Sequence, residues 1–426
     1  MTITILGRQP AISLAELESL YGSQNVHAVG DIAATIDSEI DFARIGGSLK
    51  AAEFFTSLDT TNPQKVFDYC RKALPEFIAD FPEGKIKLGV SMYGLSMPLA
   101  KQNANTLSLK KVIRDIGRSV RVVPNTEAAL SSAQTYHNQL TSAVGCELLM
   151  IRDGDKTLIG RVTHVQNINE YTERDRERPK RDTKVGMLPP KLAQTIINLA
   201  VGSRQPGRLA SSSEEAKKRG EQPETTASSL RGSNSEEARF QTGSDLPTLL
   251  DPFCGTGVIL QEAALMGYGV YGSDIEPRMI DYSRKNLEWL TSKYPLPNLN
   301  PQLESADATD HIWRQPIYTV ACEGYLGTPF ASEPPDTPLK DTIMTCNLIT
   351  KKFLRNIHGQ LAPNTRLCIA VPAWYVRGRI HHLPFLDDIA AVGYTRVEFK
   401  HAAASDLTYH RDDQVVGREL LVLSVA

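Results

Sequence analysis

Apolar and polar positions alternate along several short runs in residues 1–165. Ile3-Thr4-Ile5-Leu6 and the run from Lys85 to Ser91 have the two-residue period of half-buried strands. The same pattern predicts a strand at residues 119–123. Because helices are predicted between these strands, this part of the chain is expected to be α+β.

Two helices are predicted among these strands. Ser13, with Glu16 three positions later, has the form of a capping box, so a helix is expected to begin there. A second, basic helix is expected over residues 107–116. From Lys101 to Arg121 the chain has six basic residues and one acidic residue, which fits a phosphate-facing surface or an ordinary solvated helix face.

From residue 247 onward, apolar runs of strand length alternate with runs of helical period. Seven strands are predicted, at about residues 247–251, 268–274, 301–306, 318–323, 365–371, 396–402 and 418–425. The first five alternate with helices, as in a parallel doubly wound sheet. The last two are expected to face each other as an antiparallel pair. This part is therefore predicted to be a seven-stranded α/β domain.

Connecting segments separate these regions. Residues 166–186 carry many charges of both signs, as a soluble linker does, and residues 202–246 are too polar to offset their ordering entropy, so disorder is predicted. Pro189 and Pro190 can begin a helix, whose apolar face is expected to pack against the following domain. That face has Leu192, Ile196, Leu199 and Ala200. The predicted domains are 1–75, 76–165 and 187–426, joined by the linker 166–186.

Composition sets limits on the protein class. The 426 residues are 41% hydrophobic and 23% charged with a net charge of -2, as in an ordinary globular protein, so any nucleic-acid surface must be local. The absence of a targeting segment and of a long apolar run predicts a cytoplasmic protein with no membrane partner. No two of the six cysteines form a Cys-x-x-Cys pair, so reduced, packed thiols and no metal site are expected.

One stretch carries the candidate chemistry. The apolar run that ends at Asp251 breaks into a turn with Gly255 and Gly257, after which helical spacing resumes. Glycine lets a ligand approach the backbone closely. The next predicted strand brings Asp274 to the same sheet edge, where an acid can accept from ribose hydroxyls. The alternative is a βαβ unit without a ligand, in which Asp274 only caps a helix.

The residues around this turn favour S-adenosylmethionine over a dinucleotide. A dinucleotide site has a third glycine, but position 260 is Leu, and Asp251 places negative charge where the pyrophosphate would lie. S-adenosylmethionine has no phosphate, and its ammonium group can meet a carboxylate. Asp307 after the third strand can accept from an adenine amine or cap a helix. The predicted cofactor residues are Asp251, Phe253, Cys254, Gly255, Thr256, Gly257, Asp274, Ile275, Asp307 and Ala308.

The run Asp251-Pro252-Phe253-Cys254-Gly255-Thr256-Gly257, followed by Gly272-Ser273-Asp274-Ile275, resembles motif I and the following acid of class I methyltransferases. In this form it is similar to the THUMP-domain RNA guanine-N2 methyltransferases. Residues 124–138, Arg178-Pro179 and residues 186–193 resemble the same family. The resemblance implies a Rossmann-like methyltransferase domain, preceded by an N-terminal ferredoxin-like module and a THUMP domain that holds tRNA.

The loop after the fourth strand reads Glu323-Gly324-Tyr325-Leu326. An exocyclic amine is a poor nucleophile because its lone pair is delocalised, so an enzyme needs acceptors for its N–H groups and close placement of the methyl donor. The family has a D-P-P-Y-type loop here. In this chain Glu323 stands for the aspartate, Gly324 and Tyr325 for the prolines and Leu326 for the aromatic. The resemblance therefore implies Glu323, Gly324 and Tyr325 as catalytic residues in a divergent motif.

Two regions are predicted to bind RNA. The THUMP resemblance favours the phosphate-facing interpretation of the basic helix. The loop before the last strand has side chains that can stack on a base and contact phosphate, or that simply form a polar hairpin. The predicted RNA-binding residues are Lys110, Lys111, Arg114, Arg118, Arg121, Tyr409, His410 and Arg411. Trp374 and Tyr375 are placed similarly and are equally consistent with packing.

The sequence thus predicts a methyltransferase that uses S-adenosylmethionine and acts on the exocyclic amine (N2) of a guanosine in tRNA. Two alternatives stay open. The first is a noncatalytic RNA-binding protein that retains the fold, which the altered loop at Glu323 favours. The second is a nicotinamide-dependent enzyme, which Leu260 and Asp251 oppose. The sequence does not determine whether a small activating protein is a partner.

Overall fold

The computed structural model describes residues 1–182, 188–204, 246–297, 299–330 and 332–426. It divides into two compact units: unit 1 is Met1–Thr172 with Lys400–Ala402, and unit 2 is Glu173–Phe399 with Ala403–Ala426. The disorder predicted for residues 202–246 concerns a segment almost all of which lies outside the described residues.

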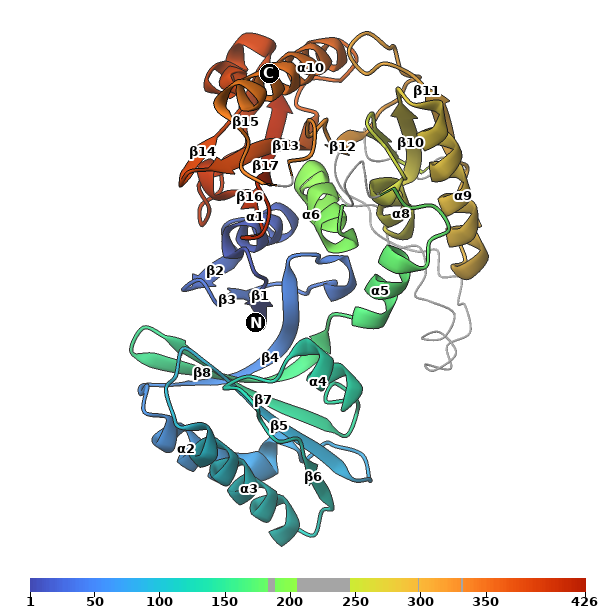
Figure 1. The fold of residues 1–426 in the computed structure, drawn as a ribbon. Coiled ribbons are helices and arrows are strands. Elements are labelled where there is room, and N and C mark those ends of the chain that lie inside the picture. The colour runs from blue at the N-terminus through green and yellow to red at the C-terminus, as the bar shows by residue number, and fades with distance from the viewer. Residues whose placement is uncertain (183–187, 205–245, 298, 331) are drawn as a thin grey trace. The chain divides into compact units, whose positions relative to one another are not determined.

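Unit 1 is organised around one sheet, which has eight strands among the described residues. They are β1 Thr2–Leu6, β2 Val26–Val29, β3 Ala33–Ile36, β4 Ser48–Leu58, β5 Ile86–Tyr93, β6 Val120–Val122, β7 Gly145–Asp153 and β8 Lys156–Val165. Their order is β2-β3-β1-β4-β8-β7-β5-β6 (Figure 1). β4 pairs with β1 on one side and β8 on the other, so the two modules predicted on either side of residue 75 share this sheet.

The helices of unit 1 are α1 Pro10–Tyr21, the 3-10 helix η1 Phe42–Arg44, α2 Pro63–Phe77, α3 Leu99–Asp115 and α4 Ser132–His137. α2 and α3 lie side by side on one face of the sheet (Figure 1). Phe67 and Leu74 of α2 and Leu109 and Ile113 of α3 are fully buried in one cluster with β5 and β7. The predicted basic helix is therefore present and begins earlier than expected, at Leu99.

The capping box predicted at Ser13 is wrong. α1 begins at Pro10, because proline fits the first helical turn, and Ser13 lies inside the helix. Ser13 Oγ donates to the Gly47 carbonyl at 2.7 Å. The Glu16 carboxylate accepts from the Gly46 and Gly47 amides at 2.9 and 2.7 Å. Both side chains therefore fix the start of β4 instead of capping α1.

The strands of unit 2 are β9 Thr248–Asp251, β10 Gly269–Asp274, β11 Gln302–Ser305, β12 Thr319–Glu323, β13 Arg366–Val376, β14 Arg379–His381, β15 Tyr394–Arg396, β16 Thr408–Tyr409 and β17 Val416–Val425. Within the described ranges their main order is β11-β10-β9-β12-β13-β17-β15. The first five of these run parallel, and β17 is antiparallel to both β13 and β15. The predicted Rossmann-like class, with a reversed last strand, is confirmed.

Two details of that sheet differ from the prediction. The strand expected at 396–402 is shorter and earlier, at Tyr394–Arg396, and Lys400–Ala402 belong to unit 1. Lys400–Ala402 belong to unit 1 because the Glu18 carboxylate of α1 accepts from the Lys400 and His401 amides at 2.8 and 2.7 Å. β14 and β16 were not predicted, since each has only two or three residues.

The remaining helices are α5 Ile168–Arg176, α6 Pro190–Val201, α8 Val258–Leu265, α9 Pro277–Lys293, α10 Asp336–His358, and the 3-10 helices η3 Pro384–Val392 and η4 Ala404–Asp406. α6 begins at the predicted proline and is buried along its whole length against β12, β13 and α8. The core of unit 2 joins α10 to the sheet through Phe353, Ile369 and Trp374. All six cysteines are free and buried, as predicted. No helix in the described part of the chain has the length and apolarity needed to cross a bilayer.

Candidate functional site

The turn between β9 and α8 is the first part of the site. Asp251 is the last residue of β9, and Val258 is the first of α8. Gly255 and Gly257 take φ values of 51° and 82°, which residues with a Cβ rarely adopt. A Cβ on Gly257 would also lie 2.8 Å from Ser283 Oγ, so both conformation and space require glycine there.

Asp274 fixes this turn from the neighbouring strand. It ends β10, which pairs with β9, and its Oδ2 accepts from the Gly255 amide at 2.9 Å. Its Oδ1 accepts from the Glu276 amide, also at 2.9 Å. Burial raises the pKa of Asp274, and these two bonds oppose the rise. Since each oxygen has a second lone pair, the carboxylate keeps acceptor capacity for a ligand.

Two polar residues of α9, neither of them predicted from the sequence, hold the backbone of the turn. Ser283 Oγ donates to the Gly255 carbonyl at 2.9 Å, and Asn286 Nδ2 donates to the Thr256 carbonyl at 2.8 Å. Asn286 also exchanges two 2.9 Å bonds with the backbone of Lys180. Their three-residue spacing, which places them on one helix face, was the available signal.

Asp251 is buried at the base of the turn. Its Oδ1 accepts from the Phe253 amide at 3.2 Å. Burial raises the pKa of Asp251 well above its usual value; the Phe253 bond opposes this, and the charges of Asp274 and Glu323 add to it. Asp251 therefore lies in the electrostatic field of Asp274 and Glu323, which end the strands on either side of β9. This arrangement favours a cationic ligand over an anionic one.

The other predicted cofactor residues differ in how far their side chains are exposed. Cys254 is buried, and burial raises the pKa of its thiol well above the usual value, so it is a packing residue and not a ready nucleophile. Ile275 is exposed and Ala308 is buried. Asp307 is exposed at the same edge, and its Oδ1 accepts from the Thr309 amide at 2.9 Å. The capping bond of Asp307 is thus present, and a second lone pair is left for another donor.

Glu323 ends β12, the strand on the other side of β9. Its Oε1 accepts from Arg418 Nε, and the two side chains are 16% and 9% exposed. The Gly324 amide donates to the Ala370 carbonyl at 2.9 Å, which extends the ladder with β13 into the loop. Tyr325 is 42% exposed. Arg418 was not predicted as a site residue, because no local pattern reveals a partner 95 positions away.

The C-terminal loop separates its three predicted RNA-binding residues. Tyr409 lies in β16, and Arg411 donates to its hydroxyl at 3.3 Å with the guanidinium 6.0 Å from the ring centroid. His410 stacks instead on Tyr375, with the ring centroids 3.5 Å apart and the planes at 11°. Trp374 is fully buried and belongs to the core.

The basic surface of unit 1 lies on α3 and β6. Arg118 differs from the other predicted residues, because its guanidinium donates to the Phe81 and Pro82 carbonyls at 3.3 and 2.6 Å. The Arg118 side chain is therefore bound to the backbone of the segment that precedes β5. The predicted cations that are exposed or half-buried and have no such backbone bond are Lys110, Lys111, Arg114 and Arg121.

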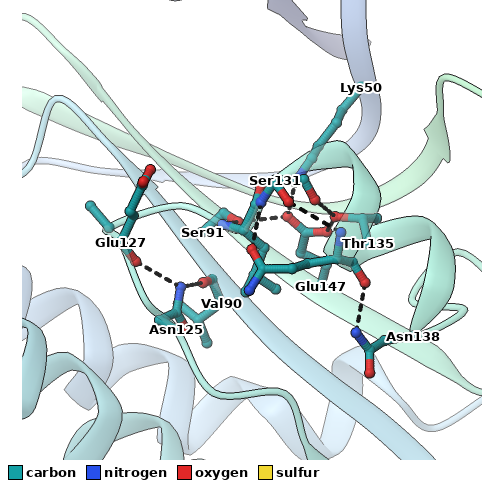
Figure 2. Close-up of polar contacts among 12 residues, drawn as sticks. Lys50, Val90, Ser91, Asn125, Glu127, Ser131, Thr135, Asn138 and Glu147 are labelled. Atoms are coloured by element: carbon teal, nitrogen blue, oxygen red, sulfur yellow. Dashed lines mark hydrogen bonds and ion pairs between the residues drawn. The ribbon is translucent and has the colours of Figure 1, made fainter. Parts of the chain in front are cut away.

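A buried ion pair lies inside unit 1, and it was not predicted. Figure 2 shows Glu147 surrounded by Lys50, Ser91 and Thr135. Glu147 Oε1 accepts from Lys50 Nζ at 2.5 Å and from Ser91 Oγ at 2.6 Å, and Oε2 accepts from Thr135 Oγ1 at 2.6 Å. Lys50 Nζ also donates to the Leu130 carbonyl at 2.8 Å. Desolvation lowers the pKa of Lys50, and the charge of Glu147 opposes that change.

The same region holds the segment that resembles a THUMP domain. Asn125 Nδ2 donates to the carbonyls of Val90 and Glu127 at 2.9 and 3.2 Å (Figure 2). Gln102 Nε2, from α3, donates to the Ala128 carbonyl at 2.8 Å. These bonds and the ion pair fix the backbone between β6 and α4, next to the basic helix.

The match to a family model covers the part of the chain that forms the turn. Residues 241–296 match a family model described as RMKL-like, methyltransferase domain. A tRNA (guanine(10)-N2)-dimethyltransferase of Methanothermobacter thermautotrophicus is 32% identical over 126 residues, which cover 29% of this chain and 32% of that protein. The corresponding protein of Pyrococcus abyssi is 31% identical over 128 residues, 29% of this chain and 33% of its own length. The chain thus matches about a third of the length of these curated relatives.

One solved structure aligns with the whole length of the chain. The crystal structure of TrmN from Thermus thermophilus covers 100% of this chain and 99% of its own, with 16% identity and a TM-score of 0.49. The family match spans the glycine turn and Asp274, and the resemblance of that stretch to methyltransferases is confirmed. Residues 241–296 are thus similar to an RMKL-like methyltransferase domain, and the strands described within this range, β9 and β10, belong to the parallel part of a sheet whose last strand is reversed.

Proposed function

We propose that this protein is an S-adenosylmethionine-dependent RNA methyltransferase that acts on the exocyclic amine of a guanosine in tRNA. The observation that carries the proposal is the group of three carboxylates, Asp251, Asp274 and Glu323, around a turn that requires glycine. The two curated relatives are tRNA (guanine(10)-N2)-dimethyltransferases, which supports the choice of tRNA guanine N2. A location in the cytoplasm is part of the same proposal.

The residues of the turn fit S-adenosylmethionine, whose sulfonium and ammonium groups are cationic. Gly255 and Gly257 allow close approach to the backbone, and Asp274 retains acceptor capacity for ribose hydroxyls. Asp251 supplies negative charge for the ammonium group, and Ile275 and Asp307 would lie beside the adenine. When bound, this cofactor supplies an electrophilic methyl group.

Glu323 is the proposed acceptor for the amine of the target base. Arg418 Nε is the one hydrogen-bond partner of this carboxylate within the described residues, and it binds Oε1. Oε2 is therefore left to accept an amine N–H, which withdraws the proton and directs the nitrogen lone pair toward the methyl donor. The Gly324 amide bond to Ala370 holds the loop that carries the carboxylate. Tyr325, which is exposed, completes the proposed catalytic group.

Unit 1 is proposed to hold the RNA through the cations of α3 and β6 that remain exposed or half-buried. The buried network around Glu147 fixes the neighbouring backbone, so this surface is formed before RNA arrives. Preformed surfaces bind with a smaller ordering cost. In unit 2, Tyr409 and Arg411 are proposed to contact the RNA near the target, whereas His410, stacked on Tyr375, holds their loop.

The direct test is transfer of labelled methyl from S-adenosylmethionine to bulk tRNA, followed by nucleoside analysis. Wild type, Asp274→Ala and Glu323→Ala are compared, with cofactor and tRNA binding measured for each. The expected result is N2-methylguanosine from wild type, loss of cofactor binding in Asp274→Ala, and loss of transfer with retained binding in Glu323→Ala. No incorporation by a wild type that binds both ligands would favour the noncatalytic RNA-binding alternative.

A further inference from the structure

The registers of the last strands show which side chains share a face of the sheet with Glu323. Directly opposite residues of a ladder lie on the same face, and so do alternate residues along one strand. Glu323 is opposite Ala370, and Arg418 is opposite Pro372, two residues further along β13. Tyr409 is opposite Arg418. Tyr409, Arg418 and Glu323 therefore share one face at the carboxyl edge of β12.

The next residue, His410, belongs to the other face. A Cβ on Gly417 would lie 2.8 Å from the Tyr375 ring and 3.2 Å from His410 Cβ, so the stacked pair rests on the face of β17 that carries Gly417. Because Gly417 and Arg418 are adjacent in a strand, their faces are opposite. The Tyr375–His410 stack therefore fastens the loop to the back of the sheet, while Tyr409 faces the side of Glu323.

Tyr409 is also held in place. Arg411 Nη2 donates to the Tyr409 hydroxyl at 3.3 Å, and the guanidinium carbon of Arg411 lies 6.0 Å from the centroid of the Tyr409 ring. Directly opposite residues in an antiparallel pair have Cβ atoms about 5 Å apart. The ring thus stands next to the arginine that binds Glu323, and both Tyr409 and Arg411 are half-buried.

We propose that Tyr409, positioned by Arg411, is the surface on which the target base stacks while its amine meets Glu323. The inference rests on the proposed function and names the residue that selects and holds the base. A base taken out of its stack needs an aromatic or apolar partner in the protein. Leu326, which is not aromatic, occupies the fourth position of the loop that begins at Glu323, and Tyr325 in that loop is 42% exposed. Tyr409 supplies the flat face from a different strand.

The experiment measures kcat and KM for tRNA, and tRNA affinity without turnover, for Tyr409→Phe and Tyr409→Leu in the full chain. Base stacking predicts that the Phe variant stays within about 3-fold of wild type, while the Leu variant loses about 10-fold or more in kcat/KM. Affinity for S-adenosylmethionine is expected to be unchanged in both. The kcat/KM of Arg411→Gln is expected to lie between those of Tyr409→Phe and Tyr409→Leu.

Tyr375→Phe and Tyr375→Leu are the matched controls, because they make the same changes on the opposite face. Tyr375→Leu is expected to lower the midpoint of thermal unfolding and to leave KM for tRNA within about 2-fold. If Tyr409→Leu behaves as wild type does, or if Tyr375→Leu causes the same kinetic loss, the proposal is overturned.

The measurement of tRNA affinity without turnover separates this proposal from the proposed function. A wild type that binds tRNA without methylating it, with affinity that falls in Tyr409→Leu and is kept in Tyr409→Phe, would contradict the methyltransferase and retain Tyr409 as a base-stacking residue. Methylation that does not depend on Tyr409 would retain the enzyme and remove this inference. A wild type that neither methylates nor binds tRNA would remove both.

Discussion

Two ion pairs, one in each unit, differ in what they leave open. Lys50 and Glu147 are 2% and 0% exposed, and both oxygens of Glu147 are bound by protein donors. Glu323 and Arg418 are 16% and 9% exposed, and Arg418 binds one oxygen of Glu323. Because Glu147 is fully buried and both of its oxygens are bound, a substrate cannot reach it and it can only hold structure. A carboxylate that is fixed by a single partner still has an acceptor for a substrate.

The largest effect is expected from Lys50→Met, which leaves the Glu147 carboxylate buried without an opposite charge. Breaking a buried pair in this way costs about 3–5 kcal/mol in the free energy of unfolding. Lys156→Met is the matched control, because Lys156 lies 3.3 Å from Asp59 in an exposed pair. That control is expected to cost less than about 1 kcal/mol. Equal losses of unfolding free energy in Lys50→Met and Lys156→Met, measured by denaturant titration, would contradict the structural role of the buried pair.

Arg418→Gln tests the Glu323–Arg418 pair, in which one carboxylate oxygen is left for a substrate. Without the guanidinium, Glu323 loses the bond that orients it, so kcat is expected to fall by about 10-fold or more with a change of less than about 3-fold in KM for tRNA. Arg396→Gln is the control, since Arg396 lies 3.6 Å from Glu419 on the opposite face of β17. A loss of stability in Arg418→Gln as large as that of Lys50→Met would make the two pairs equivalent.

Asp251→Asn is expected to stabilise the protein while weakening cofactor binding. The folded-state pKa of Asp251 is raised, so folding favours the protonated acid and the ionised form destabilises the native state as pH rises above the unfolded pKa. Removing the charge should therefore raise the unfolding midpoint by about 2–4 °C at neutral pH, and by less in acid. Cofactor affinity of wild type should fall as pH is lowered through the raised pKa. A lower midpoint for Asp251→Asn at neutral pH would refute this account.

The smallest effects are expected on the basic surface. Lys111→Ala and Arg114→Ala should each weaken tRNA binding by about 2–5-fold and reduce its dependence on salt, because each removes one phosphate contact. Arg118→Ala should instead lower stability, since its guanidinium binds two backbone carbonyls. Filter binding at several salt concentrations distinguishes them. Unchanged salt dependence in the first two variants would exclude this face as the RNA surface.

The sequence predicted those parts of the fold that local periodicity encodes. The strand before Asp251, the glycine turn and the strand ending at Asp274 were found because strand, turn and helix follow one another within about 25 residues. The alternation of strands with helices predicted a parallel sheet, in which the carboxyl ends of the strands meet at one edge. The positions of Asp251, Asp274 and Glu323 at one edge followed in turn.

Long-range partners were not predictable in this way. Lys50 and Glu147 are 97 positions apart, and neither lies in a pattern that marks an ion pair. Ser13 and Glu16 have the spacing of a capping box, but tertiary contacts with Gly46 and Gly47 use both side chains. Tyr409 and His410 are adjacent in sequence and lie on opposite faces of the sheet. The pairing of β16 with β17 decides which of the two residues faces Glu323. Such assignments require the register of the strands.

The most direct test compares Glu147→Gln with Glu323→Gln in the same two assays, the free energy of unfolding and the single-turnover rate of methyl transfer to tRNA. The account predicts that Glu147→Gln loses stability and keeps its transfer rate once folded. It predicts that Glu323→Gln keeps stability and cofactor affinity and loses about 100-fold in rate. If Glu323→Gln transfers methyl groups at the wild-type rate, this carboxylate is not the acceptor for the amine, and the proposed chemistry of the site is wrong.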